Sequence, residues 1–120
     1  MADKTLVIGA SENVQRYSNM AIRKLLDYGH EVVAIGNKEG EVKGVKIEKS
    51  TPLFENVDTV TLYLNPSNQK SYYDYILQLQ PNRVVFNPGT ENPELQQKLK
   101  EHHIRYENAC TLVLLSMNEY

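Results

Sequence analysis

Short apolar runs alternate with amphipathic segments along this chain, and that alternation restricts the possible folds more than any other feature. Runs rich in β-forming residues predict buried strands at residues 5–10, 30–36, 58–64, 82–86 and 103–108. Strands that alternate with helices of ordinary length form a parallel sheet, and the helices cover both of its faces. The sequence therefore predicts an α/β fold built on a five-stranded parallel sheet with helices on both faces.

Helix start and stop signals lie between these strands. The first helix is predicted to begin at Ser18, a plausible N-cap, and to end before Gly29. A second helix is predicted after Ser67, and a third is predicted to be capped by Asn92. The last segment, 111–120, is apolar nearly all round, which indicates either a buried closing helix or a contact in a homodimer.

Length and charge limit the class of protein further. The chain has 120 residues, so we expect one domain that spans residues 1–120. A formal net charge of −2 gives no reason to expect nucleic-acid binding, and every apolar run is too short to cross a bilayer. The start MADKT has no apolar signal region, and the single cysteine cannot form an internal disulfide. These features predict a cytoplasmic protein without nucleic-acid or membrane partners.

Ligands of open α/β sheets bind outside the carboxyl ends of the strands, where the strand order reverses. The residues that directly follow the predicted strands are small, polar and almost uncharged, and they include no acid–base pair. They can offer backbone N–H groups and side-chain amides to a ligand. These candidate ligand-binding residues are Gly9, Ala10, Ser11, Gly36, Asn37, Lys38, Asn65, Pro66, Asn87, Pro88, Gly89, Asn108 and Cys110.

The loop after the first strand is the most informative of these segments. Gly9 allows the backbone to approach an anion closely, and Ser11 and Ser18 can donate hydrogen bonds to it. The free N–H groups and the dipole at the helix start also favour negative charge. Arg16 adds a planar fork of donors that suits phosphate oxygens. The combination predicts an anion site, whereas each residue alone also fits a tight turn with an exposed arginine.

Two absences narrow the choice of phosphate ligand. Only Gly9 is present from the G-x-G-x-x-G pattern of dinucleotide-binding proteins. No carboxylate ends the second strand, where the ribose of NAD would need one. Lys38 lies there instead, and a lysine suits a phosphate on the adenosine ribose better than a free hydroxyl, although a solvated loop lysine is the simpler interpretation.

The spacing G-A-S-x-x-x-x-R-x-S over residues 9–18 resembles the CoA-binding domain family. That family includes the nucleotide-binding domain of the succinyl-CoA synthetase α subunit and small stand-alone bacterial proteins. The likeness covers nearly the whole chain, and the order and spacing of its parts make it specific. Its further parts are Glu41-Val42 with Gly44, Ser50 with residues 53–58, Asn65-Pro66, Asn87-Pro88-Gly89 with Glu91, and Asn108 with Cys110.

The resemblance implies a Rossmann-like three-layer sandwich that binds coenzyme A or an acyl-CoA. It implies that the diphosphate lies over the first loop near Arg16, with the adenosine near Asn37 and Lys38. The pantetheine arm would pass the turns at 65–66 and 87–89. Small stand-alone members of the family look like binding modules, so the resemblance implies a small cytoplasmic CoA-binding protein without catalytic machinery of its own.

Other chemistry has weaker support in the sequence. Cys110 could act as a nucleophile or exchange thiols with CoA, but a lone cysteine is more often a packed thiol. All three histidines are expected at the amino ends of strands, away from the ligand edge, and no third ligand is spaced for a metal. Tyr72, Tyr73 and Tyr75 at helical spacing indicate core or interface rather than base stacking.

Two other functions stay open at this point. The domain could bind NAD(P) and serve a small oxidoreductase or a redox sensor, although the missing glycines and the lack of an acid–base pair argue against this class. Alternatively, the nucleotide pocket could be vestigial, and the working surface of the protein would then be a homodimer or partner contact.

Overall fold

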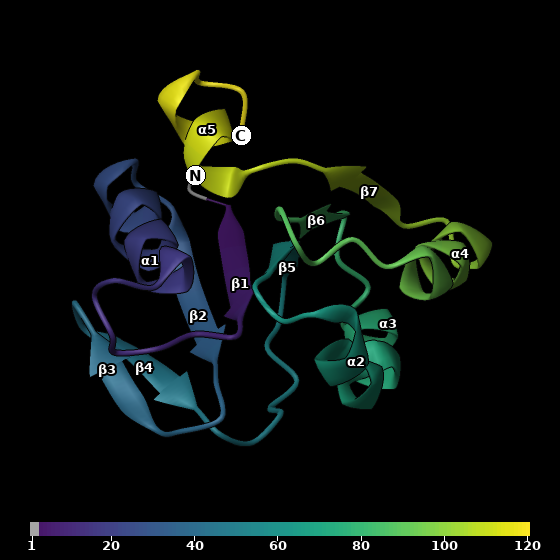
Figure 1. The fold of residues 1–120 in the computed structure, drawn as a ribbon, viewed down its shortest axis with the longest axis horizontal. Helices are drawn as coiled ribbons and strands as arrows, with labels where there is room; N and C mark the ends of the chain where they lie inside the picture. The colour runs from purple at the N-terminus through teal and green to yellow at the C-terminus, as the bar shows by residue number, and fades with distance from the viewer. Residues whose placement is uncertain (1–2) are drawn as a thin grey trace.

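A computed structural model of the chain describes residues 3–120 and shows an α/β fold (Figure 1). The strands are β1 (Lys4–Ile8), β2 (Glu31–Ile35), β3 (Gly40–Val42), β4 (Val45–Glu48), β5 (Val57–Leu62), β6 (Arg83–Phe86) and β7 (Arg105–Asn108). The helices are α1 (Tyr17–Asp27), α2 (Pro66–Gln69), the 3₁₀ helix η1 (Lys70–Tyr72), α3 (Tyr73–Leu79), α4 (Pro93–Glu101) and α5 (Thr111–Ser116). The sheet order is β3-β4-β2-β1-β5-β6-β7, and only β3 runs antiparallel to its neighbour.

The prediction of a five-stranded sheet is wrong in number, because the sheet has seven strands. All five predicted strands are present, and the two extra ones, β3 and β4, form a hairpin. The sequence of this polar segment indicates a loop with a short extended piece around residues 45–47, which is where β4 lies. The hairpin turns at Lys43 and Gly44, which both have positive φ, as a tight two-residue turn requires. Its apolar residues Val42, Val45 and Ile47 are buried, and β4 continues the sheet by pairing in parallel with β2.

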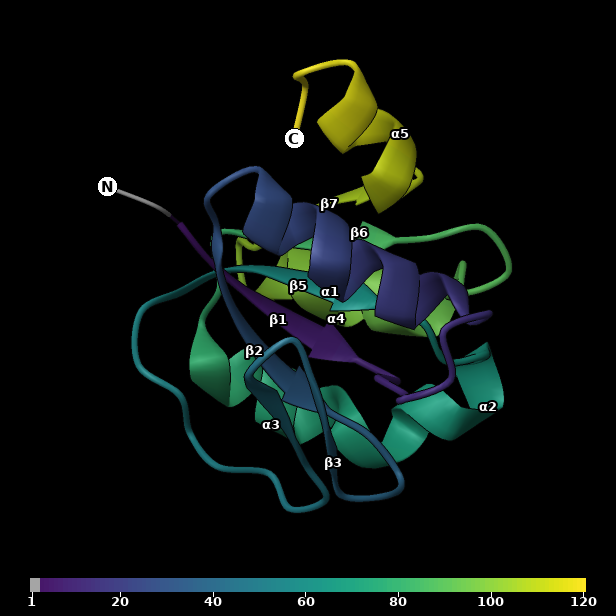
Figure 2. The ribbon, with the colours of Figure 1, turned by 90° about the vertical axis from the view of Figure 1, so that its left-hand side faces the viewer.

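Helices cover both faces of the sheet, as predicted, so the three-layer arrangement is confirmed (Figures 1 and 2). Alternation along β1 sends Leu6 and Ile8 to one face and Val7 to the other. The face of Leu6 packs against α3 and α4, and the face of Val7 packs against α1 and α5. Among residues 3–120, no helix has the length and apolar character needed to cross a membrane.

A buried asparagine ties the carboxyl end of β6 to its neighbours. Asn87 Nδ2 donates to Thr61 Oγ1 at 2.7 Å and to the Leu62 carbonyl at 2.9 Å. Asn87 Oδ1 accepts from the Thr111 N–H at 2.8 Å. The side chain is 2% exposed, so these bonds replace water that cannot reach it. Asn87 therefore connects β5, β6 and the start of α5.

We expect Asn87→Ala to lower the free energy of unfolding by about 2–3 kcal/mol, because it removes the side-chain partner of the Leu62 carbonyl and of the Thr111 N–H, while Thr61 Oγ1 keeps its bond to Thr111 Oγ1. Asn108→Ala is the matched control, since Asn108 is exposed at the end of β7 and its side chain accepts one bond, from Gln96 Nε2. The control should change stability by no more than about 0.5 kcal/mol. Urea unfolding followed by circular dichroism measures both values, and equal losses would contradict a bracing role for Asn87.

Asp58 in β5 is expected to make the stability of the fold depend on pH in the acidic range. Burial raises the pKa of this carboxyl, but hydrogen bonds from Asn82 and Thr59 and the charge of Arg83 outweigh burial and hold the pKa below its ordinary value of 3.8. A carboxyl whose pKa is lowered by folding stabilises the native state above its unfolded pKa, and this contribution is lost as the pH falls through the folded pKa.

We therefore expect Asp58→Asn to remove part of the loss of stability that the wild type shows below pH 3.8. Asp27→Asn, at an exposed position in α1, should keep the wild-type dependence. The test is to measure the urea concentration at the unfolding midpoint for each protein, from neutral pH to below pH 3.8. Parallel curves for the wild type and Asp58→Asn would show that the carboxyl has no such role.

Candidate functional site

A cavity of about 510 Å³ opens at the carboxyl ends of β1, β2 and β5. β1 lies between the other two strands, and the chain crosses to β2 on one side and to β5 on the other. This is the point where the strand order reverses, which is where open α/β sheets bind their ligands. The cavity thus lies at the edge of the sheet to which the sequence pattern assigned the site.

The structure brings about half of the predicted site residues to this cavity. Those that line it are Gly9, Ala10, Ser11, Arg16, Gly36, Asn37 and Asn65. Those that do not line it are Ser18, Lys38, Pro66, Asn87, Pro88, Gly89, Asn108 and Cys110. Sequence reasoning missed five lining residues, which are Tyr63, Leu64, Asn68, Ser71 and Tyr72.

The glycines of the cavity floor are required by contacts between chain segments. The N–H groups of Gly9 and Ala10 both donate to the Ile35 carbonyl at 2.9 Å, so these amides are used within the protein. Gly9 has φ +96°, and a Cβ there would lie 3.0 Å from the Tyr63 carbonyl carbon. A Cβ at Gly36 would lie 2.4 Å from the Ala10 carbonyl oxygen. The floor is therefore closely packed backbone in which Gly9 and Ala10 have no free amide for an anion.

Hydrogen bonds from α1 hold the loop above this floor. Asn19 Nδ2 donates to the Ser11 carbonyl at 2.9 Å, and Arg23 Nε donates to Asn19 Oδ1 at 2.8 Å. The Asn13 N–H donates to Ser11 Oγ at 3.0 Å. Because Ser11 Oγ serves as an acceptor in this bond, its own hydroxyl proton is left to donate to a ligand in the cavity.

Arg16 lies at the start of α1 and is the only charged residue in the cavity lining. It occupies the N-cap position, so the predicted cap, Ser18, is instead a buried residue of the first turn. The N–H groups of Tyr17 and Ser18 have no acceptor within the helix, as in any first turn. The helix start and the Arg16 guanidinium together give this wall of the cavity a positive potential.

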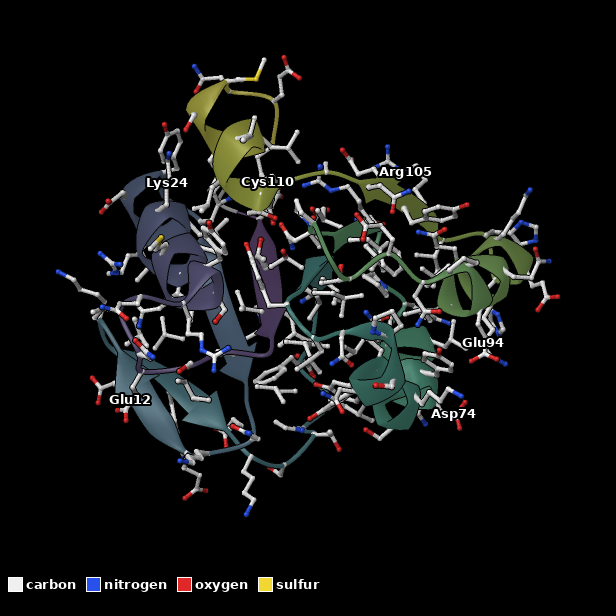
Figure 3. The ribbon with its side chains drawn as sticks, in the orientation of Figure 1. Glu12, Lys24, Asp74, Glu94, Arg105 and Cys110 are labelled. Carbon is white, nitrogen blue, oxygen red and sulfur yellow. The ribbon has the colours of Figure 1, made fainter. Side chains whose placement is uncertain are left out.

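The carboxylate of Glu12, on the same loop as Ser11, is bonded to β3 and does not line the cavity. Glu12 Oε2 accepts from the Glu41 N–H of β3 at 2.9 Å, and the Glu12 side chain packs over Gly40. Figure 3 shows Glu12 beside the β3–β4 hairpin. This contact joins the first loop to the edge strand and leaves the guanidinium as the one ionised group that faces a ligand.

The opposite wall is polar and neutral. Asn65 caps α2, since its Oδ1 accepts from the Asn68 N–H at 3.0 Å and from Ser67 Oγ at 2.9 Å. The helix therefore begins two residues earlier than predicted, and the acceptor atom of Asn65 serves the cap. Asn68, Ser71 and Tyr72 line the same wall and offer amide and hydroxyl groups.

A buried network separates the cavity from the turn after β6. Gln69 Nε2 donates to the carbonyls of Leu64 and Thr90, at 2.8 Å each, and Gln69 Oε1 accepts from Asn92 Nδ2 at 2.9 Å. Pro88 and Gly89 are exposed beyond this network. Of the two turns over which the pantetheine arm is predicted to pass, the turn after β5 lines the cavity and the turn after β6 does not.

Cys110 lies outside the cavity as well. It is a half-buried free thiol that precedes α5, and Figure 3 shows it at the base of that helix, apart from α2. Asn108, two residues before it, is bonded to Gln96 at the far edge of the sheet. The closing segment of the chain thus braces the fold and does not contribute to the lining of this cavity.

Tyr63 and Tyr72 are the ionisable residues of the lining besides Arg16, and both are half-buried. The Tyr63 hydroxyl is buried beside Thr61 and Thr111, whose hydroxyls bond each other at 2.8 Å. Burial raises the pKa of Tyr63 well above its ordinary value, so the phenol stays protonated at neutral pH. Within residues 3–120, no three His, Cys, Asp or Glu side chains gather as metal ligands would.

Comparison with known proteins agrees with this geometry. A family model described as a CoA binding domain matches residues 3–116. A crystal structure described as an uncharacterized protein is 49% identical, with a TM-score of 0.97, over 100% of this chain and 99% of that chain. A structure described as cell-free ID.343 from Thermus thermophilus is 25% identical, with a TM-score of 0.87, over 99% of this chain and 91% of the other.

A larger protein shares the fold alone. The dinucleotide-forming acetyl-coenzyme A synthetase 1 of Ca. Korarchaeum cryptofilum, in complex with phosphate and ADP, is 19% identical, with a TM-score of 0.72, over 89% of this chain and 25% of that chain. None of the curated proteins matches this chain. The family model covers nearly all of the chain, so the resemblance found in the sequence is confirmed and the chain belongs to the CoA-binding domain family.

Proposed function

We propose that this protein binds coenzyme A or an acyl-CoA in the cavity between β1, β2 and β5 and does no chemistry on it. One observation carries the proposal. Arg16 and Ser11 line the same cavity at the switch point of the sheet, with no acidic residue in the lining. A guanidinium and a hydroxyl suit the oxygens of a diphosphate ester, and membership of the CoA-binding domain family supports the proposal.

The lining residues suggest how the ligand would lie. The diphosphate would contact Arg16 and Ser11, and the adenosine would lie toward the end of β2, at Gly36 and Asn37. Lys38 is exposed on the same loop and outside the lining. The pantetheine arm would lie along the remaining wall, which extends from Leu64 over α2 and η1.

The absence of catalysis is part of the proposal. A general acid or base must lie within hydrogen-bond reach of the reacting atom. The lining offers only a permanently charged guanidinium, neutral amides and hydroxyls, and a tyrosine whose pKa burial raises. We therefore propose a binding protein rather than an enzyme.

Calorimetric titration of Arg16→Ala with CoA tests the site. Loss of a charge-assisted hydrogen bond should raise Kd by about tenfold to a hundredfold. Lys100→Ala is the matched control, because it removes the same charge from an exposed position in α4 and should leave Kd unchanged.

The same titration with NAD separates the two nucleotide classes. The end of β2 has Gly36 and Asn37 in the lining and no carboxylate there for a ribose, so we expect CoA to bind more tightly than NAD. Clear binding of NAD without any heat from CoA would overturn the proposal.

We also propose a cytoplasmic homodimer formed through α5. Val113 and Met117 are 51% and 58% exposed, and the groove between α1 and α5 carries both Arg23 and Asp27, which two copies could pair. Met117→Lys should shift sedimentation toward the monomer, whereas Leu53→Lys, at an apolar residue exposed elsewhere, should not. A wild type that sediments as a monomer at every concentration would refute the dimer.

A further inference from the structure

The size of the cavity limits how much of a ligand it can enclose. Its volume of about 510 Å³ lies within the range of sites that enclose drug-sized molecules, roughly 300–1,000 Å³. Coenzyme A is considerably larger than such molecules, and an acyl-CoA is larger still. If the nucleotide end lies in the cavity, some part of the ligand must extend beyond it into solvent.

Contacts on the β6 side of the cavity limit the direction in which a bound ligand can extend. Toward β6, the bonds from Gln69 to Leu64 and Thr90 fill the space between the loops after β5 and β6. Gln69 is fully buried and is not part of the cavity lining. The lining beyond the end of β5 is formed by residues of α2 and η1, so a ligand that crosses the cavity from β2 to β5 would extend along these two segments.

The wall on this exit path suits the arm of the cofactor and not an acyl chain. Asn68 and Ser71 are exposed, and Tyr72 is half-buried beside them. Their amide and hydroxyl groups can pair with the two amides and the hydroxyl of pantetheine. An acyl chain would instead need a continuous apolar surface, and Leu64 and Ala10 are the only aliphatic residues in the lining.

Apolar grooves do exist elsewhere on the molecule, but they do not continue this cavity. One of about 180 Å³ lies over the amino half of β2 and includes Val32, Val45 and Phe54. The other lies between α1 and α5 and includes Met20 and Leu112. Neither shares a lining residue with the cavity, so neither can receive a chain that leaves along η1.

We infer that the protein recognises the CoA carrier alone and leaves the thiol or thioester in solvent, so that its affinity does not depend on the acyl group. This inference rests on the proposed function, because it requires the cofactor to lie in this cavity. It assigns the neutral wall of Asn68, Ser71 and Tyr72 to the pantetheine arm and predicts a ligand class: CoA together with its acyl esters of any length.

Calorimetric titrations with CoA, acetyl-CoA and octanoyl-CoA test the inference. We expect the three Kd values to agree within about threefold, whereas burial of an eight-carbon chain would tighten binding by more than about a hundredfold. If CoA binds and octanoyl-CoA binds more than about tenfold tighter, only this inference is wrong. If none of the three binds, the proposed function fails together with it.

The reactivity of the bound thiol gives a second, independent measurement. Cys110→Ser removes the one protein thiol and lies outside the cavity lining, so the reaction of Ellman's reagent then reports CoA alone. At saturating protein, the bound thiol should react within about twofold of the rate of free CoA, because an exposed thiol keeps its ordinary reactivity. A rate slowed tenfold or more by an excess of protein would place the thiol inside the protein and overturn the inference.

Discussion

The close contact of three backbone segments at the carboxyl ends of β1, β2 and β5 determines what the rest of the site can be. The Ile35 carbonyl accepts from both Gly9 and Ala10, and Gly36 lies so near the Ala10 carbonyl that a side chain would not fit. This contact holds the central strands in register and forms the cavity floor. Because it also consumes two amides that a phosphate-binding turn usually leaves free, the proposed anion site depends on rim side chains and on the start of α1. That requirement explains why a guanidinium and a hydroxyl on the first loop are central to the proposed site.

Polar residues at the ends of parallel strands can either brace loops or contact a ligand. In this structure the buried residues brace loops, and the exposed ones line the cavity. Asn87, Asn92 and Gln69 are buried, and the carbonyl oxygen and the amide nitrogen of each side chain pair with other residues, so they brace loops against one another. Asn37 and Asn68 are exposed and line the cavity, where a ligand can reach them. The buried residues hold the loops in place, and the loops in turn position the exposed residues. The proposed site therefore depends on the bracing residues although they do not line the cavity.

Local patterns predicted most of the fold, and non-local contacts account for most of the errors. The five buried strands were predictable because runs of β-forming residues are local signals. Of the β3–β4 hairpin, only an extended piece around residues 45–47 was predictable, because the two strands have three and four residues and the turn depends on the positive φ of Lys43 and Gly44. In the site, Tyr63 and Leu64 were missed because β5 ends at Leu62, two residues before the predicted end. Asn68, Ser71 and Tyr72 were missed because they lie on helical segments, and only the packing of α2 and η1 beside the first loop brings them to the cavity.

The chemistry of the lining supports the proposal that the domain binds its ligand without reacting with it. A catalyst stabilises charge that develops at the reacting atom, and it needs groups fixed close to that atom. Here the only ionised group, Arg16, lies with Ser11 at the first loop, where the diphosphate would be held, and the path from there to the thiol passes neutral amides and hydroxyls. Because Tyr63 stays protonated, its phenol cannot serve as a base along that path. Under the proposed function, recognition is concentrated on the constant part of the cofactor, and its reactive end extends into solvent.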